Sequence, residues 1–350
     1  MVQPLIVNSR EIGPGRPAYC IAEMSANHNG SLERAKDIIR AAADSGADAV
    51  KLQTYTPDTM TLDCGSDTFR IKGTVWAGQT LHDLYAGAYT PWKWHESLLA
   101  LAGDLGLDLF STPFDATAVN HLESLATPVY KVASLEIVDH PLLEKIGGTG
   151  KPVILSTGAS SLAEIDDALR VLRAAGAGPV ALLRCVSAYP APVREMNLRT
   201  IPHLAETFGV VSGLSDHSLG WAVAVAAVAL GASIVEKHFT LARSDGGADS
   251  TFSMEPAEFE AMVRAVRDAE QALGAVDYTV TDTQKETMVF RRSLFAARDI
   301  QKGERFTNEN VRVVRPGHGL HPRHFAMLMA GKRAAQDIPF GTPLTWEMVG

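Results

Sequence analysis

The sequence has little cysteine and no closely spaced cysteine pair. Cys20, Cys64 and Cys185 are the only three in 350 residues, which excludes a disulfide framework and is typical of a reducing compartment. The longest apolar run, residues 221–235, is shorter than the roughly 20 residues that a membrane span needs. The first residues meet a charge and a Gly-Pro-Gly break too early for a signal peptide. We therefore expect a cytoplasmic protein with no membrane partner.

Positive charge is also scarce. The 32 Lys and Arg residues against 40 Asp and Glu residues give a net charge of −8, so the long-range field has the wrong sign for nucleic acid. An anionic substrate would need a local basic pocket. The sequence also lacks a Gly-x-Gly-x-x-Gly turn between strand and helix, a Walker lysine and a Gly-x-Ser-x-Gly elbow. These absences exclude nucleic acid partners and remove the common nucleotide-binding and serine-hydrolase motifs.

Short apolar runs alternate with longer amphipathic segments from residue 19 to about residue 274. The apolar runs predict eight strands, at 19–23, 48–53, 108–112, 129–134, 152–157, 181–187, 210–215 and 234–239. Helical periodicity between them is clearest at 32–43, 162–175 and 256–273. The strands are continuously apolar, as expected for a parallel sheet buried on both faces. Eight repeats in about 255 residues predict an α/β fold, a (β/α)8 TIM barrel.

The pattern changes after the barrel, which we place at residues 1–274. Residues 275–291 are polar and aperiodic and predict a linker, and residues 292–350 predict a small, mostly β domain. Inside the barrel, residues 54–95 form a long insertion after the second strand that is rich in aromatic residues. Loops after barrel strands lie where substrates bind, so we expect some of these aromatics at the site and others in packing.

All eight predicted strands end in polar or ionisable residues, which a purely structural barrel would not require. The second and fourth of them carry Lys51 and Lys131. Together with neighbouring hydroxyls these lysines are suited to bind a phosphate or carboxylate. The hydroxyls are those of Ser134, Ser156, Thr157 and Ser187. The alternative for each lysine is a salt bridge to a carboxylate on the next strand.

Two histidines, His217 and His238, end the seventh and eighth strands, which are neighbours in a barrel. Two imidazoles with open positions beside them suit Mn, Fe, Zn or Co. Glu136 is a further candidate ligand, directly or through water. The alternative is that both are hydrogen-bonded core histidines, as most of the 11 histidines should be.

Several motifs occur in order along the chain and together resemble the sialic acid synthase family. They are IAEMSANHNGSLERA from Ile21, KLQTYTPD from Lys51, FSTPFD from Phe110, YKVAS from Tyr130, STGAS from Ser156, CVSAYP from Cys185, GLSDHS from Gly213 and EKHFTL from Glu236. The segments SLFAARDI, GERFT, NVRVVRPGHGL and DIPFGTPLTW resemble that family's antifreeze-like domain. The stretch from Val75 to His95, SLEIVDHPL and GGADSTFS are most similar to the pseudaminic acid branch.

This resemblance implies a reaction and its partners. Phosphoenolpyruvate condenses with an open-chain amino-sugar aldehyde to give a nine-carbon 2-keto acid and phosphate, and in the pseudaminic acid branch the sugar is 2,4-diacetamido-2,4,6-trideoxy-L-altrose. The resemblance further implies a divalent metal, with Mn favoured and Mg or Co as alternatives, and a domain-swapped homodimer.

The resemblance also assigns residues by motif position. It implies contacts to phosphoenolpyruvate from Lys51, Ser111, Lys131, Ser134, Ser156, Ser187 and Ser215. It implies metal binding by His217 and His238 with Glu136 close by, and sugar contacts from Glu23, Gln53, Tyr189, Asp249 and Arg315. The predicted catalytic residues are Glu23, for proton transfer, with His217, His238 and Arg315.

Three alternatives remain at this point. A synthase for N-acetylneuraminate or legionaminate would use the same chemistry on a different amino sugar. A Schiff-base aldolase would use Lys131 or Lys237 as the nucleophile. A non-catalytic protein would bind ice, polysaccharide or a protein partner through the small domain, although eight functionalised strand ends argue against a mere scaffold.

Overall fold

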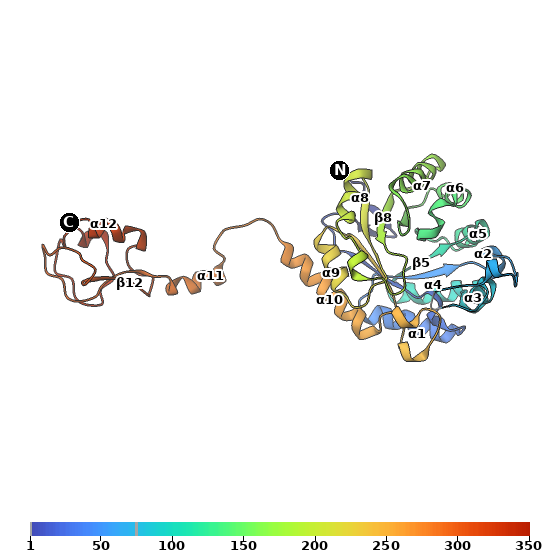
Figure 1. Ribbon diagram of the computed structural model, residues 1–350, viewed down its shortest axis with the longest axis horizontal. Coiled ribbons are helices and arrows are strands. Elements are labelled where there is room, and N and C mark those ends of the chain that lie inside the picture. The colour runs from blue at the N-terminus through green and yellow to red at the C-terminus, as the bar shows by residue number, and fades with distance from the viewer. Residues whose placement is uncertain (1, 74–75) are drawn as a thin grey trace. The chain divides into compact units, whose positions relative to one another are not determined.

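Eight parallel strands close into a barrel, and every strand pairs with its neighbours along the chain (Figure 1). The computed structural model describes residues 2–73 and 76–350. The barrel strands are β3 (Tyr19–Glu23), β4 (Ala49–Thr54), β5 (Asp108–Pro113), β6 (Tyr130–Val132), β7 (Val153–Ser156), β8 (Val180–Cys185), β9 (Val211–Asp216) and β10 (Ile234–His238). Pairing of β10 with β3 completes the ring, so the predicted TIM barrel is confirmed.

Helices surround the strands, as the ring of labels in Figure 1 shows. They are α1 (Leu32–Asp44), α4 (His95–Asp104), α5 (Ala116–Ser124), α6 (His140–Gly147), α7 (Leu162–Ala175), α8 (Thr200–Phe208), α9 (Ala222–Ala229) and α10 (Pro256–Leu273). Helix α7 begins where Ser161 and Glu164 form a capping box, and α10 begins at a proline that needs no amide partner. The helices predicted near 32–43, 162–175 and 256–273 are thereby confirmed.

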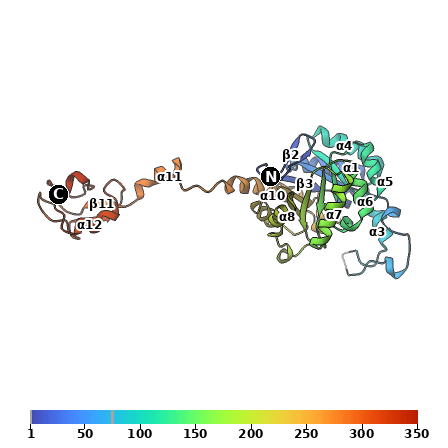
Figure 2. The same ribbon diagram turned by 90° about the horizontal axis from the view of Figure 1, so that it is seen from above.

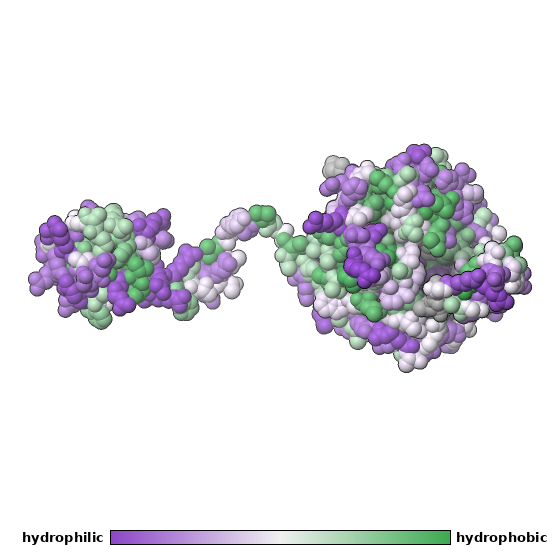
Figure 3. All heavy atoms as spheres, in the orientation of Figure 1, coloured by the Kyte–Doolittle hydropathy of each residue, from purple (hydrophilic) through white to green (hydrophobic). Residues whose placement is uncertain are grey.

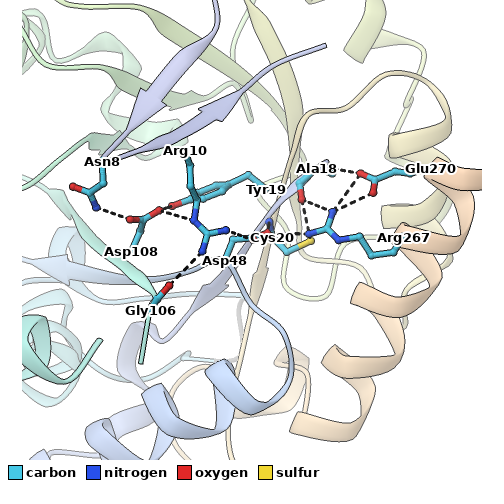
Figure 4. A network of polar contacts seen from close by, with 10 residues as sticks. All are labelled: Asn8, Arg10, Ala18, Tyr19, Cys20, Asp48, Gly106, Asp108, Arg267 and Glu270. Carbon is cyan, nitrogen blue, oxygen red and sulfur yellow. Dashed lines mark hydrogen bonds and ion pairs between the residues drawn. The ribbon is translucent and has the colours of Figure 1, made fainter. Parts of the chain in front are cut away.

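A short hairpin, which the sequence analysis did not predict, lies against the amino-terminal end of the barrel. Strand β1 (Leu5–Val7) pairs with β2 (Arg10–Ile12), and the two strands are too short to give a periodic signal. Leu5, Val7 and Ile12 are buried together with the inward-facing residues at the start of the barrel strands. The apolar residues of the hairpin thus fill this end of the barrel. Beside them, polar residues of the hairpin, the strand starts and α10 form one network (Figure 4). This end of the barrel is therefore closed.

The insertion at residues 54–95 contains the helices α2 (Pro57–Met60) and α3 (Leu81–Ala88) and the 3-10 helices η2 (Asp67–Phe69) and η3 (Trp92–Trp94). Figure 2 shows it projecting from the barrel beside α3. Thr74 and Val75 lie outside the described residues. Val75 is the first residue of the segment from Val75 to His95 that resembles the pseudaminic acid branch. Further 3-10 helices follow barrel strands: η1 (Ser25–His28), η4 (Ser134–Val138), η5 (Val193–Glu195), η6 (Arg243–Asp245) and η7 (Ser250–Phe252).

A second compact unit comprises Ala275–Gly350. Strands β11 (Ser293–Ala296) and β12 (Val311–Val314) form an antiparallel pair, and the helices are α11 (Asp282–Thr287), η8 (Met288–Phe290), η9 (Pro322–His324), α12 (Phe325–Met329) and η10 (Trp346–Met348). Its own core contains Leu294, Phe306 and Leu344. The segment predicted as a linker includes the short helix α11. Thr281 and Gln284 form a capping box at its start, which is a helix signal that periodicity alone does not detect. None of the described helices has the length and apolar character of a membrane span.

Candidate active site

Strand alternation directs one set of polar side chains into the barrel. On β10, Ile234 belongs to the interior core and Val235 to the core between strands and helices. Because side chains alternate along a strand, Glu236 and His238 face inward and Lys237 faces outward. The same alternation on the other strands gives an inward polar set of Glu23, Lys51, Gln53, Thr112, Lys131, Ser156, Cys185 and Ser215. These side chains meet at the carboxyl end of the barrel.

Lys51 is bound to two carboxylates. Its Nζ lies 2.6 Å from Glu23 Oε2 and 3.7 Å from Glu236 Oε1, and all three side chains are nearly inaccessible to solvent. Burial would lower the pKa of Lys51, but the two carboxylates raise it above its ordinary value. Burial raises the pKa of Glu23, although Lys51 opposes it. The carboxyl of Glu23 is therefore suited to hold a proton.

Lys131 is bound only to neutral groups. Its Nζ donates to Ser156 Oγ at 2.6 Å and to the carbonyl of Val132 at 2.9 Å, and it forms no direct ion pair within the described residues. Burial lowers the pKa of this lysine. Glu236 is close enough to oppose this lowering, but no carboxylate in the described part of the chain is in direct ion-pair contact with the ammonium. A buried ammonium without such a contact attracts an anion, since an anion would compensate its lost hydration.

A cradle of hydroxyls adjoins Lys131. The amide of Gly158 donates to Ser134 Oγ at 2.9 Å. A Cβ added to Gly158 would lie 2.3 Å from Ser187 Oγ, 2.8 Å from Ser134 Oγ and 3.2 Å from Cys185 Sγ, so only glycine leaves these groups in place. The cradle and Lys131 offer one cation and several neutral donors on neighbouring strands, which suits a phosphate group.

His217 and His238 lie side by side, with ring centroids 5.3 Å apart. The Nδ1 of His217 lies 2.9 Å from the carbonyl oxygen of Val186, which orients the ring and leaves its Nε2 available. The Nδ1 of His238 is buried and has no hydrogen-bond partner. Burial, together with the nearby His217 and Lys51, holds the pKa of His238 well below its ordinary value, so this imidazole is neutral.

The two histidines fit a divalent metal as a pair of nitrogen donors with open positions. A buried imidazole nitrogen without a partner is the observation that supports this fit. Among residues 2–73 and 76–350, no three His, Cys, Asp or Glu side chains gather in a geometry that holds a metal. Further ligands would therefore come from substrate or water, as in catalytic rather than structural sites.

Cys185 connects the histidines to the cradle. Its Sγ lies 3.8 Å from His217 Nδ1 and 4.0 Å from Ser187 Oγ. Burial would raise the pKa of this thiol, but the contact with His217 lowers it to about 7. The predicted anion site and the predicted metal site thus lie next to each other at the carboxyl end of the barrel.

A chain of hydrogen bonds extends from Glu23 toward the loop after β10. Gln53 Nε2 donates to Glu23 Oε1 at 3.0 Å and to Ser25 Oγ at 2.8 Å, and Ser25 Oγ donates to Asp249. Burial raises the pKa of Asp249. Tyr189 completes this region, because its ring lies 4.3 Å from that of His217. Three of the five predicted sugar contacts thus form one polar chain, and a fourth covers the histidines.

Comparison with known proteins bears on what this arrangement does. A model of the NeuB family matches residues 38–278, and a model of the SAF domain matches residues 291–350. The chain belongs to the NeuB family. It is 44% identical to the pseudaminic acid synthase of Helicobacter pylori over 94% of this chain and 97% of the relative, and 44% identical to that of Campylobacter jejuni strain 81-176 over 94% and 96%. The structure is similar to that of the spore coat polysaccharide biosynthesis protein spsE from Bacillus subtilis, with a TM-score of 0.67, 34% identity and 99% of each chain covered.

The structure does not bring every predicted residue of this NeuB-family chain into the cluster. Ser111 is fully buried, and its Oγ lies 2.6 Å from Thr54 Oγ1 on the outward face of the strands. The inward neighbour, Thr112, takes its place and accepts from Lys51 at 3.2 Å. The expected contact of Ser111 with phosphoenolpyruvate therefore disagrees with the strand alternation, which the sequence already implied.

Three other residues lie apart from the cluster. Glu136, in η4, is half-buried, and burial raises its pKa; within the described residues it does not form a metal-holding group with the two histidines. Arg315 is exposed in the second unit, after β12. Lys237 points outward, where its Nζ lies 2.7 Å from Asp216 Oδ2. A buried, paired and outward lysine is not available as an imine-forming nucleophile.

The sequence analysis left Ser25, Thr112, Cys185 and Glu236 out of its set of site residues. Three of them follow from alternation, because each lies two residues from another inward residue of the same strand or its extension. Cys185 precedes Ser187 in this way, and Glu236 precedes His238. Ser25 had no such signal, because it lies on a 3-10 helix after β3.

Proposed function

We propose that the chain condenses phosphoenolpyruvate with 2,4-diacetamido-2,4,6-trideoxy-L-altrose to give pseudaminic acid and phosphate. The 44% identity to pseudaminic acid synthases over nearly the whole chain supports this activity. The structural observation that carries it is the adjacency of an anion cradle at Lys131 and Gly158 to the paired histidines, with Cys185 in contact with both. A phosphate-bearing enol and an aldehyde can therefore meet there.

Phosphoenolpyruvate binding is assigned chiefly to Lys131 and the hydroxyls of Ser134, Ser156 and Ser187. Among the described residues, Lys131 has no carboxylate in direct ion-pair contact, whereas Lys51 contacts both Glu23 and Glu236. An incoming phosphate would thus form its strongest contact with Lys131. Lys51 and Ser215, which donates to Glu236 at 3.4 Å, would complete the pocket on its other side.

His217 and His238 would hold the divalent metal, for which Mn is our first choice and Mg or Co the alternatives. When bound there, the cation supplies Lewis-acid polarisation of the aldehyde oxygen. Tyr189, packed on His217, restricts the water that reaches this point. Glu136 would lie further out and contribute through water, since it contacts neither ring.

The bond changes follow from this placement. The C3 carbon of phosphoenolpyruvate attacks the aldehyde carbon, and the aldehyde oxygen takes a proton. Glu23 is the proposed donor, because its raised pKa lets it hold that proton and Gln53 orients its carboxyl. Water then adds to the cation left at C2 and returns one proton to Glu23. Phosphate leaves with cleavage of the bond between C2 and oxygen and takes the remaining hydroxyl proton, which leaves the 2-keto group. Lys131 stays with the departing phosphate.

A phosphate-release assay tests the proposal. Phosphoenolpyruvate is offered with a panel of 2-acetamido sugars, with and without divalent metal, and the product is identified by mass. We expect release with the diacetamido trideoxy sugar and metal. Preferential use of N-acetylmannosamine or of the legionaminate precursor would assign the chain to another branch of the family. The free thiols of Cys20, Cys64 and Cys185 favour the cytoplasm as the place of this reaction.

A homodimer is the proposed assembly, with Arg315 of one chain serving the site of the other. Exposed apolar residues follow four consecutive barrel strands and favour a covered surface there: Leu135, Val138, Leu162, Val193, Leu219 and Trp221. Figure 3 shows apolar residues in green among hydrophilic ones on the barrel face that it presents. The fork of donors on Arg315 would bind an N-acetyl carbonyl of the sugar.

Mixing two inactive variants tests this exchange. Arg315→Ala and His217→Ala proteins, combined after subunit exchange, should regain part of the wild-type rate, because one site of a mixed dimer keeps both groups. No recovery despite proven exchange would refute it.

An imine mechanism is the second candidate, and one observation favours it. Burial lowers the pKa of Lys131, as an imine-forming lysine requires. Borohydride added during turnover would fix such an imine as a stable mass increase on Lys131. We expect no such adduct, since the enol carbon of phosphoenolpyruvate is already nucleophilic.

A further inference from the structure

The aromatic residues of the insertion divide into two groups by what they contact. Most pack on the barrel and its helices. The ring centroids of Tyr85 and Tyr55 lie 5.7 Å apart, and those of the stacked Trp92 and His121 lie 4.8 Å apart. Trp94 meets His28 edge-on, with ring centroids 5.4 Å apart. These contacts hold the insertion in place, and none of them is with the paired histidines. Their number explains why a long segment stays attached to the barrel.

Trp76 differs from these. The ring centroids of Trp76 and Tyr189 lie 5.9 Å apart, and the angle between the two ring planes is 60°. The Nε1 of Trp76 donates to the carbonyl of Ala248 at 3.0 Å. Tyr189 in turn lies 4.3 Å from His217. Trp76 is therefore one aromatic ring away from a candidate metal ligand, and it is only partly buried.

Trp76, Tyr189 and Phe252 together form an aromatic wall. Phe252 lies 4.9 Å from Tyr189 and 5.0 Å from His238, so the wall runs from the histidines to the rim. The polar chain of Glu23, Gln53, Ser25 and Asp249 belongs to the same mouth. An amphipathic ligand is the natural occupant of such a site, with hydroxyl and amide groups on the polar chain and C–H groups on the rings.

We propose that Trp76 is a specificity-determining residue that contacts the deoxygenated end of the amino sugar. The inference rests on the proposed function, which places the aldehyde carbon at His217 and His238. An open-chain sugar held there extends its far end, the C6 methyl group, toward the rim. The indole offers that methyl an apolar surface, and the hydrogen bond to Ala248 fixes the indole's position.

The chemistry of the contact decides between sugars. A C6 methyl loses only water on meeting an indole face, whereas a C6 hydroxyl loses hydrogen bonds that the indole face does not replace. Rejection of an added hydroxyl by an apolar surface amounts to about 100-fold at most. Trp76 would thus contribute a moderate part of the selectivity.

The test compares 2,4-diacetamido-2,4,6-trideoxy-L-altrose with the same sugar bearing a 6-hydroxyl. For the wild type we expect a preference for the deoxy sugar in kcat/KM. In Trp76→Ala the ratio of the two kcat/KM values should fall about 10-fold, mainly through the KM for the deoxy sugar, while the KM for phosphoenolpyruvate stays within about twofold. Trp76→Phe, which keeps an apolar ring, should retain most of the preference.

Trp92→Ala is the matched control, because it removes an equally large ring that stacks on His121 rather than on the wall. It should lower the melting temperature and leave the sugar ratio unchanged. An unchanged ratio in Trp76→Ala, or an equal fall in Trp92→Ala, would overturn the role of Trp76 alone. A wild type that uses neither sugar would overturn the proposed function and this inference with it.

Discussion

The two ends of the barrel both carry dense polar networks, yet they differ in how completely the polar groups are paired. At the amino-terminal end, Arg10 Nη1 lies 2.7 Å from Asp48 Oδ1 and Arg267 Nη2 lies 3.1 Å from Asp48 Oδ2. The hydroxyl of Tyr19 donates to Asp108 at 2.7 Å (Figure 4). None of these side chains has a buried polar atom without a partner in the described part of the chain.

At the carboxyl end, pairing is incomplete. Glu236 Oε2 and His238 Nδ1 are buried without hydrogen-bond partners, and the hydrogen bonds of Lys131 go to neutral groups only. Each unpaired group costs free energy that the fold would not retain for stability alone. We therefore infer that the contacts at the amino-terminal end stabilise the packing of the hairpin, the strands and α10. At the carboxyl end, we expect the unpaired groups to bind substrate and metal.

The largest effect should follow from removal of a histidine. His217→Ala or His238→Ala should lower kcat/KM about a thousandfold, because aldehyde polarisation is worth several kcal/mol. In His238→Ala the lost packing is offset by removal of an unpaired polar atom, so the melting temperature should change little. His217→Ala also loses the contact with Val186 and should be slightly less stable. Activity is measured by phosphate release and stability by thermal unfolding. A variant that loses activity only because it unfolds would contradict a catalytic role of the histidines.

A smaller loss is expected at the anion cradle. Lys131→Met removes a charge-assisted contact to phosphate worth about 1.5 to 3 kcal/mol, so kcat/KM for phosphoenolpyruvate should fall about 10- to 100-fold. Lys151→Met is the control, because Lys151 lies on the surface and pairs with Glu123 at 2.7 Å. Equal losses in the two variants would show that the loss does not come from the cradle.

The least effect on catalysis is expected at the paired end. Arg267→Met leaves Asp48 with one cation fewer and should lower the free energy of unfolding by about 2 kcal/mol. Because α10 stays attached through its apolar face, including Phe259 and Val266, the barrel mouth keeps its shape. We expect kcat/KM within twofold of the wild type. Urea unfolding and the phosphate-release assay on the same preparation measure both quantities, and a large catalytic loss without destabilisation would be contrary to this assignment.

The sequence predicted the barrel because its strands are apolar on both faces and recur at a regular interval. It predicted Lys51, Lys131, His217 and His238 because each lies near a strand end. It did not predict the β1–β2 hairpin, whose three-residue strands carry no periodicity. The short helix α11 was likewise hidden within a polar stretch.

The outward position of Ser111 has a physical cause in strand alternation. Motif position favoured Ser111, but Phe110 lies in the interior core, so its second neighbour Thr112 must face inward as well. The sequence alone could not predict that Lys51 contacts two carboxylates while Lys131 is hydrogen-bonded to neutral groups. This difference depends on β10 closing onto β3, which brings Glu236 beside Glu23 and Lys51.

Calorimetric titration of phosphoenolpyruvate into three proteins tests the contrast between the two ends most directly. The wild type and Arg267→Met should bind phosphoenolpyruvate with the same affinity, and Lys131→Met should bind it at least about tenfold more weakly. Wild-type affinity in Lys131→Met, or a comparable loss in Arg267→Met, would contradict the division of the barrel into a structural end and a substrate-binding end.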